Sequence, residues 1–154
     1  MWRSLSGKPI PDILAEIAPL VGDSDRIIHI GTDSKNRGQH TDYVTVIALV
    51  TPGRGGRVYY RRERAPLTKS LPKKLIREAE LSIAVAHDVA QAMGHEILVH
   101  VDANEDVRYR SSNYCQVLAG MVMGHGFKVL LKPLSWCATY VADHVVKEKH
   151  LRAA

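Results

Sequence analysis

The feature that most constrains the fold is the long amphipathic stretch from Leu71 to Met93. It opens with Pro72 in a first-turn position and stops before Gly94, and these are the signals of a helix start and a helix end. β-like segments lie on both sides of this stretch, and two strands joined by a helical crossover tend to run parallel. The segments before it are joined by short turns and should run antiparallel. The sequence therefore predicts an α/β protein with a mixed sheet.

The other elements follow from apolar periodicity and turn residues. Alternating, β-branched segments predict strands, and apolar residues three and four apart predict helices. The glycines of "PGRGG" predict a turn between two antiparallel strands. The predicted order is helix 11–21, strands 26–33, 43–51 and 57–65, helix 71–93, strand 96–104, helix 111–126, strand 127–132 and helix 136–149.

Composition indicates the general class of protein. The chain has 154 residues, of which 45% are hydrophobic, and this suits a single domain over residues 1–154 with a core from about 26 to 148. Cys115 and Cys137 form no CxxC pair, which argues against a disulfide framework and a structural zinc site. No apolar run approaches membrane-spanning length, so we expect a soluble, cytoplasmic protein without a membrane partner. The sequence leaves the oligomeric state open.

Two aspartates follow β-like segments on either side of the helical crossover. Asp33 follows "IHIGT" and Asp102 follows "ILVHV". If these strands lie side by side and parallel, their C-terminal ends meet at the edge where open α/β sheets commonly bind ligands. Two close carboxylates repel each other unless a cation or a shared proton compensates them, and Mg²⁺ prefers carboxylate oxygens. The alternative is that each aspartate only starts a turn.

Two further acids could complete such a site. Glu78 and Glu80 lie nearly opposite each other around their helix, so only one can readily face the sheet edge. We predict Glu80, because it neighbours Ile76 on the stripe expected to be buried, whereas Glu78 ends the charged segment "KKLIRE"; the margin between them is small. In the last predicted helix, Asp143 stands among apolar residues and is the fourth candidate. The alternative for both helical acids is a solvated surface carboxylate.

Four motifs occur here in a recognisable order. They are "GTDS" after one strand, an acidic helix, "HVDAN" after a later strand and "VAD" in the terminal helix. Over residues 27–147 this arrangement resembles the ribonuclease H-like superfamily, and more narrowly the YkuK-type bacterial family, whose members are predicted nucleases. The segment "DANED" departs from the pattern, because Glu105 and Asp106 lengthen its acidic turn.

The resemblance implies both a fold and a site. The fold is a ribonuclease H-like five-stranded mixed sheet flanked by helices, with helix 11–21 as an extra N-terminal helix. The site holds two Mg²⁺ or Mn²⁺ ions and hydrolyses phosphodiester bonds. The implied catalytic and metal-binding residues are Asp33, Glu80, Asp102 and Asp143.

Basic side chains suggest where a nucleic acid would bind. The formal charge of +5 and the pI near 9.3 are compatible with a polyanionic partner. The predicted phosphate contacts are Arg61, Arg62, Lys73, Arg108 and Arg110. The alternative for the basic residues near the 57–65 strand is charge that protects a sheet edge against aggregation.

Two histidines precede the aspartates. By period-two counting, His29 shares a strand face with Asp33, and His100 shares one with Asp102. A histidine at such a position can carry protons or bind Mn²⁺. The alternative is a histidine satisfied by hydrogen bonds within the fold.

These observations lead to one functional prediction and one alternative. The sequence predicts a metal-dependent nuclease that acts on RNA or DNA. The alternative is a non-catalytic nucleic-acid-binding or partner-binding module that retains the ribonuclease H-like fold. Basic residues report phosphate attraction and do not distinguish RNA from DNA.

Overall fold

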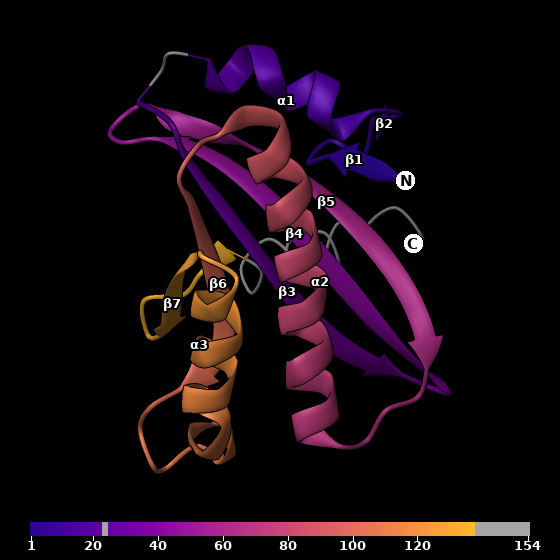
Figure 1. Ribbon diagram of the computed structural model, residues 1–154. Coiled ribbons are helices and arrows are strands. Elements are labelled where there is room, and N and C mark those ends of the chain that lie inside the picture. The colour runs from indigo at the N-terminus through magenta and orange to yellow at the C-terminus, as the bar shows by residue number, and fades with distance from the viewer. Residues whose placement is uncertain (23–24, 138–154) are drawn as a thin grey trace.

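A mixed sheet of seven strands forms the centre of the protein (Figure 1). The computed structural model describes residues 1–22 and 25–137. Most of the predicted helix 136–149, with Asp143, lies outside the described residues. The strand order across the sheet is β2-β1-β5-β4-β3-β6-β7. The strands are β1 (Trp2–Ser4), β2 (Pro9–Ile10), β3 (Ile27–Arg37), β4 (His40–Thr51), β5 (Gly55–Pro66), β6 (Ile97–Asn104) and β7 (Lys128–Lys132).

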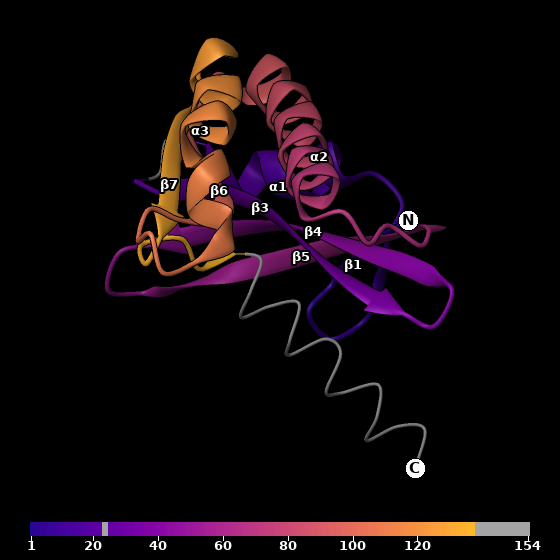
Figure 2. The ribbon, with the colours of Figure 1, turned by 90° about the horizontal axis from the view of Figure 1, so that it is seen from below.

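Helices α2 (Leu71–Met93) and α3 (Cys115–Gly124) cover one face of this sheet (Figure 2). Helix α1 (Ile13–Val21) precedes β3, and a 3₁₀ helix, η1 (Arg110–Tyr114), leads into α3. The predicted ends of α2 are confirmed, because the Ser70 side chain accepts a hydrogen bond from the backbone N–H of Lys73 and Gly94 adopts a left-handed φ of 63°. In the described parts of the chain, no helix is long and apolar enough to cross a membrane.

The predicted antiparallel meander is confirmed. Strand β4 pairs with β3 on one side and with β5 on the other, along their full lengths. The turn between β4 and β5 requires glycine, because Gly53 and Gly55 have φ angles of 73° and 80°. A Cβ at Gly56 would lie 2.4 Å from the backbone oxygen of Leu49, so the two strands approach closely there.

The prediction of a five-stranded sheet is wrong, because two short strands extend it beyond β5. Trp2 of β1 pairs with Arg61 of β5 on one side and with Ile10 of β2 on the other. Strands of three and two residues are too short to show alternation, so their existence depends on the pairing of β1 with β5 and of β2 with β1 rather than on a local pattern.

The predicted parallel arrangement around the crossover is confirmed. Strand β6 lies parallel to β3 on one side and to β7 on the other, and the last β3–β6 pair is Gly31 with His100. The predicted end of the strand at Asp33 is wrong, because β3 continues to Arg37. It continues because β4 still pairs with it there, whereas its pairing with β6 has already ended.

The main core lies between the sheet and the helices. It contains Ile28, Ile30, Ile47, Val99 and Leu118, which are fully buried. A smaller cluster on the opposite face contains Val44, Val46, Ala48, Tyr60 and Cys137. The alternation along β3 and β4 therefore buries both faces of the central strands.

Candidate functional site

Asp33 and Asp102 meet just beyond the point where the pairing of the parallel strands β3 and β6 ends. Each lies two positions beyond the last β3–β6 pair, Gly31 with His100. Burial, and then the nearby charge of Asp102, raise the pKa of Asp33 to about 6. The backbone N–H of Ser34 donates to Asp33 Oδ1 at 2.9 Å and partly opposes that shift. The structure thus brings together the two aspartates that the strand pattern selected.

Two hydroxyl contacts fix the register of α2 against β3. The Oγ atoms of Ser82 and Thr32 are hydrogen-bonded at 2.8 Å, and the Ser34 hydroxyl donates to Glu78 Oε1. Two residues of a strand advance by about 6.6 Å and four residues of a helix by about 6 Å, so contacts at these spacings fit both elements. The helix runs opposite to the strand and delivers Glu78 to the edge where Asp33 lies.

The prediction that Glu80 faces the sheet edge is wrong. Glu78 is 7% exposed, whereas Glu80 is exposed and pairs with Arg77 at 3.4 Å. The buried stripe of α2 contains Leu75, Glu78, Ala79, Ser82, Ile83 and Ala86, so its phase differs from the one that the sequence suggested.

Glu78 lies in an environment that disfavours its charge. Burial raises the pKa of Glu78 to about 8, and the charges of Asp33 and Asp102 add to the effect. The hydrogen bond from Ser34 opposes the shift but is outweighed. Glu78 is therefore protonated at neutral pH unless additional positive charge reaches the site.

Lys132 is the one cation that the structure places directly against an aspartate of this edge, among the described residues. Its Nζ forms an ion pair with Asp102 Oδ1. Burial would lower the pKa of Lys132, but the hydrogen bond and charge of Asp102, with the charges of Asp33 and Glu78, outweigh it and raise that pKa. Sequence analysis missed this residue. The signal was available, because Lys132 ends the third parallel strand at the same sheet edge as the aspartates.

The chemistry of these donors suits a hard divalent cation. Asp33, Asp102 and Glu78 offer only carboxylate oxygens, which are the donors that a hard divalent cation prefers. Within residues 1–22 and 25–137, however, no three acidic, histidine or cysteine side chains are grouped closely enough to hold an ion. The described residues therefore provide suitable donors without a complete coordination shell.

His29 and His100 form a buried pair just upstream of the aspartates. His29 Nδ1 and His100 Nε2 are 2.8 Å apart, and the ring of Trp136 packs against both. The backbone N–H of Trp136 donates to His100 Nδ1 at 3.1 Å, so the proton of His100 is on Nε2 and points to His29. Burial lowers the pKa of both histidines, that of His100 to about 3. The geometry agrees with the alternative in which these histidines are satisfied within the fold.

Arg61 and Arg62 lie on opposite faces of the sheet. The Arg61 guanidinium lies over the ring of Trp2, 5.0 Å from its centroid, and pairs with Glu63 at 3.2 Å. Arg62 is paired in register with Val44, which is paired with Asp33, so Arg62 lies in the same row and on the same face as that aspartate. Of the two arginines, Arg62 is therefore the better placed for a phosphate at the sheet edge.

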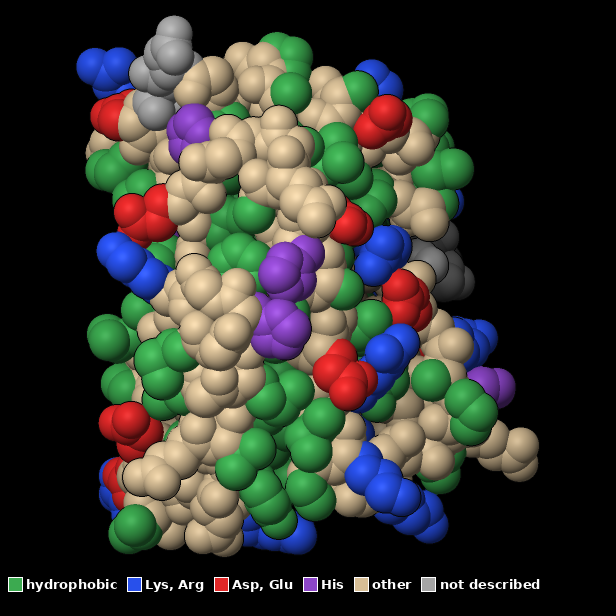
Figure 3. Space-filling view, in the orientation of Figure 1, with side chains coloured by type: hydrophobic (Ala, Val, Ile, Leu, Met, Phe, Trp, Pro, Cys, Tyr) green, Lys and Arg blue, Asp and Glu red, His purple; other side chains and the backbone are tan. Residues whose placement is uncertain are grey.

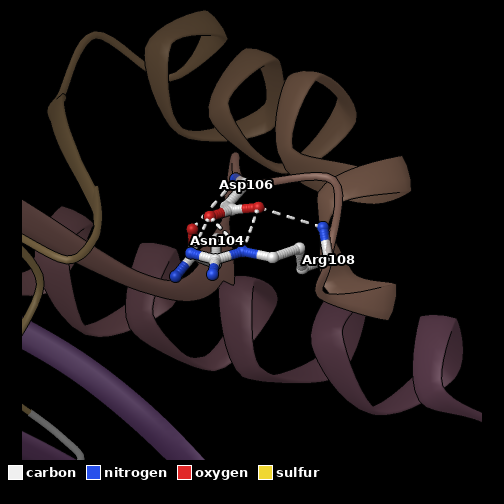
Figure 4. A network of polar contacts seen from close by, with 3 residues as sticks. All are labelled: Asn104, Asp106 and Arg108. Atoms are coloured by element: carbon white, nitrogen blue, oxygen red, sulfur yellow. Dashed lines mark hydrogen bonds and ion pairs between the residues drawn. The ribbon is translucent and has the colours of Figure 1, made fainter.

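The remaining basic candidates lie in two exposed segments. Arg108 binds Asp106 through its Nε and Nη2 atoms, and the N–H of Asp106 donates to Asn104 Oδ1 at 2.9 Å (Figure 4). The hydrogen bonds from Arg108 lower the pKa of Asp106. Lys73 in the first turn of α2 and Arg110 at the start of η1 are exposed. On the helical face, acidic and basic side chains are interspersed (Figure 3).

A family model described as Ribonuclease H-like matches residues 12–147. No curated protein and no solved structure was found to match the chain. The matched region contains the strands that carry Asp33 and Asp102 and the helix that carries Glu78. The chain therefore belongs to the ribonuclease H-like family.

Proposed function

We propose that the protein is a metal-dependent nuclease that hydrolyses phosphodiester bonds of RNA or DNA. The observation that supports this proposal most strongly is that Asp33, Asp102 and Glu78 approach one another just beyond the end of the β3–β6 pairing. Membership of the ribonuclease H-like family supports it too, and we assign the chain to the YkuK-type group on its motifs. A cytoplasmic location belongs to the same proposal.

Under this proposal, Asp33, Asp102 and Glu78 hold Mg²⁺ or Mn²⁺, with Asp143 as a further ligand. Carboxylate oxygens are the donors that both ions prefer. Such an ion, when bound, stabilises negative charge on a phosphate and lowers the pKa of a coordinated water. Its charge would also allow Glu78 to ionise at neutral pH, because the pKa of about 8 reflects burial beside other carboxylates.

The chain's own residues position the reacting groups. Hydrolysis forms a bond between a water oxygen and phosphorus, breaks the bond from phosphorus to the leaving oxygen and transfers a proton to that oxygen. Arg62, in the same row of the sheet as Asp33, and the exposed Lys73 and Arg110 are the proposed phosphate contacts. Arg61 and Arg108 contribute after exchanging their present partners, Glu63 and Asp106.

A second candidate function is binding of nucleic acid without cleavage. Lys132 already occupies one side of Asp102, and the described residues do not complete a coordination shell. A module of this kind would use the same basic residues and need no ion. Cleavage assays distinguish the two functions, because both predict binding and only the nuclease predicts turnover.

The test uses labelled single-stranded, duplex and hybrid substrates with Mg²⁺ or Mn²⁺. We expect Asp33→Asn and Asp102→Asn to lower cleavage at least about 100-fold, because each loses a carboxylate that the metal site needs. Glu78→Gln should also impair cleavage, whereas the matched control Glu80→Gln should cleave like the wild type. Equal activity in the wild type and both aspartate variants would reject the nuclease.

A further inference from the structure

The face of the sheet turned away from α2 and α3 carries a group of basic side chains beyond the carboxylates (Figure 2). Ser34 of β3 contacts α2, so its two neighbours in the strand, Asp33 and Lys35, point to the opposite face. Lys35 is paired in register with Asp42 of β4, which is paired with Arg64 of β5. Residues paired in this way point to the same side, so Lys35 and Arg64 share a face with Asp33.

Two further arginines belong to this group. Arg62 lies in the same row of the sheet as Asp33. Arg37 follows Lys35 by two positions along β3 and points to the same side. Together these residues form a surface that we call the basic face, which consists of Lys35, Arg37, Arg62 and Arg64. It lies at the end of β3 where the pairing with β6 has already stopped.

The described residues balance only part of this positive charge. Asp42 is 3% exposed, and its carboxylate pairs with Arg64 at 3.0 Å and with Arg37 at 3.6 Å. Both arginines stay accessible, since their side chains are 60% and 34% exposed. Neither Lys35 nor Arg62 forms an ion pair with another residue of the described chain. The basic face therefore carries more positive charge than Asp42 balances.

The spacing of the basic face suits the backbone of a nucleic acid. Two positions along a strand advance by about 6.6 Å, so the row of Lys35 lies about that far beyond the row of Asp33. A nucleic acid carries a phosphate at each nucleotide, and guanidinium and ammonium groups bind phosphate oxygens. A nucleic-acid strand with one phosphate at Asp33 would meet the basic face with its next phosphates.

We propose that the basic face binds the phosphate backbone of the nucleic acid, which crosses β3, β4 and β5 on the side opposite α2 to reach Asp33. This inference rests on the proposed function and adds to it the side from which the substrate approaches. Asp42 holds Arg37 and Arg64 in place on that side. Contacts of this kind read the backbone and are independent of base sequence.

The test measures how tightly the full-length protein binds fluorescently labelled RNA and DNA oligonucleotides, single-stranded and duplex, at several salt concentrations without divalent ions. We expect Lys35→Met and Arg64→Met each to lower the slope of log Kd against log salt by about one, and the double variant to lower it by about two. Arg64→Lys keeps the charge and should keep the slope. Arg54→Met is the matched control, because Arg54 is an exposed arginine just before the other end of β5.

The possible outcomes separate this inference from the proposed function. Equal slopes in Lys35→Met, Arg64→Met and Arg54→Met would overturn the basic face and leave the nuclease standing, and the basic residues would then only protect strand edges. A lowered slope in a protein that cleaves no substrate would support the basic face and favour binding without cleavage.

A wild type that binds none of the oligonucleotides would overturn both proposals. Circular dichroism checks that each variant is folded. If Arg64→Met does not fold because Asp42 loses its partner, Lys35→Met decides the test, since Lys35 forms no ion pair with another described residue.

Discussion

Strands β3 and β6 carry two pairs of polar side chains with opposite properties. In the first pair, His29 and His100 are buried and hydrogen-bonded at 2.8 Å. In the second, Asp33 and Asp102 lie close together, and burial, followed by the charge of Asp102, raises the pKa of Asp33 to about 6. Asp33 lies four positions after His29 in β3, and Asp102 lies two positions after His100 in β6.

The difference shows how neighbouring polar residues divide between structure and function. A donor paired with an acceptor lowers the cost of burying both, so the histidine pair stabilises the fold. Like charges brought together repel each other unless an opposite charge joins them, and here Lys132 pairs with Asp102. Under the proposed function, a bound divalent ion supplies the further positive charge. Four predictions test this division, in order of decreasing effect on stability.

The largest effect is expected for His100→Ala. The substitution removes the partner of His29 Nδ1 and of the Trp136 N–H and opens a cavity, so the free energy of unfolding should fall by about 3 kcal/mol. Urea unfolding measures it. In the double variant His29→Leu with His100→Leu, the loss should be smaller than the sum of the two single losses; additive losses would show that the histidines do not act as a pair.

A smaller effect of opposite sign is expected for Glu78→Gln. The folded pKa of Glu78, about 8, lies above its ordinary value of 4.5, so folding favours the protonated form. Its contribution is complete below about pH 4 and is lost as the pH rises through about 8. Glu78→Gln should therefore raise the free energy of unfolding by about 2 kcal/mol at pH 8.5 and change little at pH 4.5.

Denaturant unfolding at the two pH values measures this effect without added metal. Glu80→Gln is the matched control, because Glu80 lies two residues after Glu78 on the same helix and is exposed. If Glu78→Gln were less stable than the wild type at pH 8.5, the ionised Glu78 carboxylate would be stabilised by its contacts in the fold, as the His29–His100 pair is.

An intermediate effect is expected where hydroxyl groups join α2 to β3. Ser82→Ala leaves Thr32 Oγ1 with one partner, Thr45 Oγ1 at 3.1 Å, and should lower the free energy of unfolding by about 1 kcal/mol. The measurement is thermal unfolding beside Ala84→Ser, an exposed change on the same helix. If Ser82→Ala and the wild type were equally stable, the hydrogen bond between Ser82 and Thr32 would not be what holds α2 against β3.

The smallest effect is expected for the exposed ion pair of Arg108 and Asp106. Water screens this pair, so Arg108→Ala should shift the unfolding midpoint by less than about 1 °C. Differential scanning fluorimetry at low and high salt provides the measurement. A salt-dependent fall of several degrees in the unfolding midpoint would show that the Arg108–Asp106 ion pair stabilises the fold.

The fold was predictable where local signals and chain order agree. Alternation, the caps of α2 and the glycines near Gly55 identified the meander and the crossover, because these features depend on nearby residues. The strands at Trp2 and Pro9 were not predictable in this way, since β1 depends on pairing with the distant β5, where Arg61 is the partner of Trp2, and β2 in turn depends on pairing with β1. The predicted strand end at Asp33 was wrong because β3 has two different neighbours. Its pairing with β6 ends at Gly31, whereas its pairing with β4 continues to Arg37.

The site was predictable only to the level of strand ends. Asp33 and Asp102 follow from chain order and the edge rule. The choice between Glu78 and Glu80 depended on which side of α2 faces the sheet, and the buried Ser82 and Glu78, being polar, concealed that side from a hydrophobic pattern. Lys132 depended on a bulge that no sequence periodicity shows.

The matched contacts of Ser82 with Thr32 and of Glu78 with Ser34 limit where the sequence can accept insertions or deletions. One residue inserted between positions 78 and 82 would rotate Glu78 by about 100° around the helix axis and turn its carboxylate away from Asp33. Insertions at the turn around Gly53 would leave that geometry intact. Natural or engineered variants of this chain should therefore tolerate gaps at the hairpin turns and reject them within this stretch of α2.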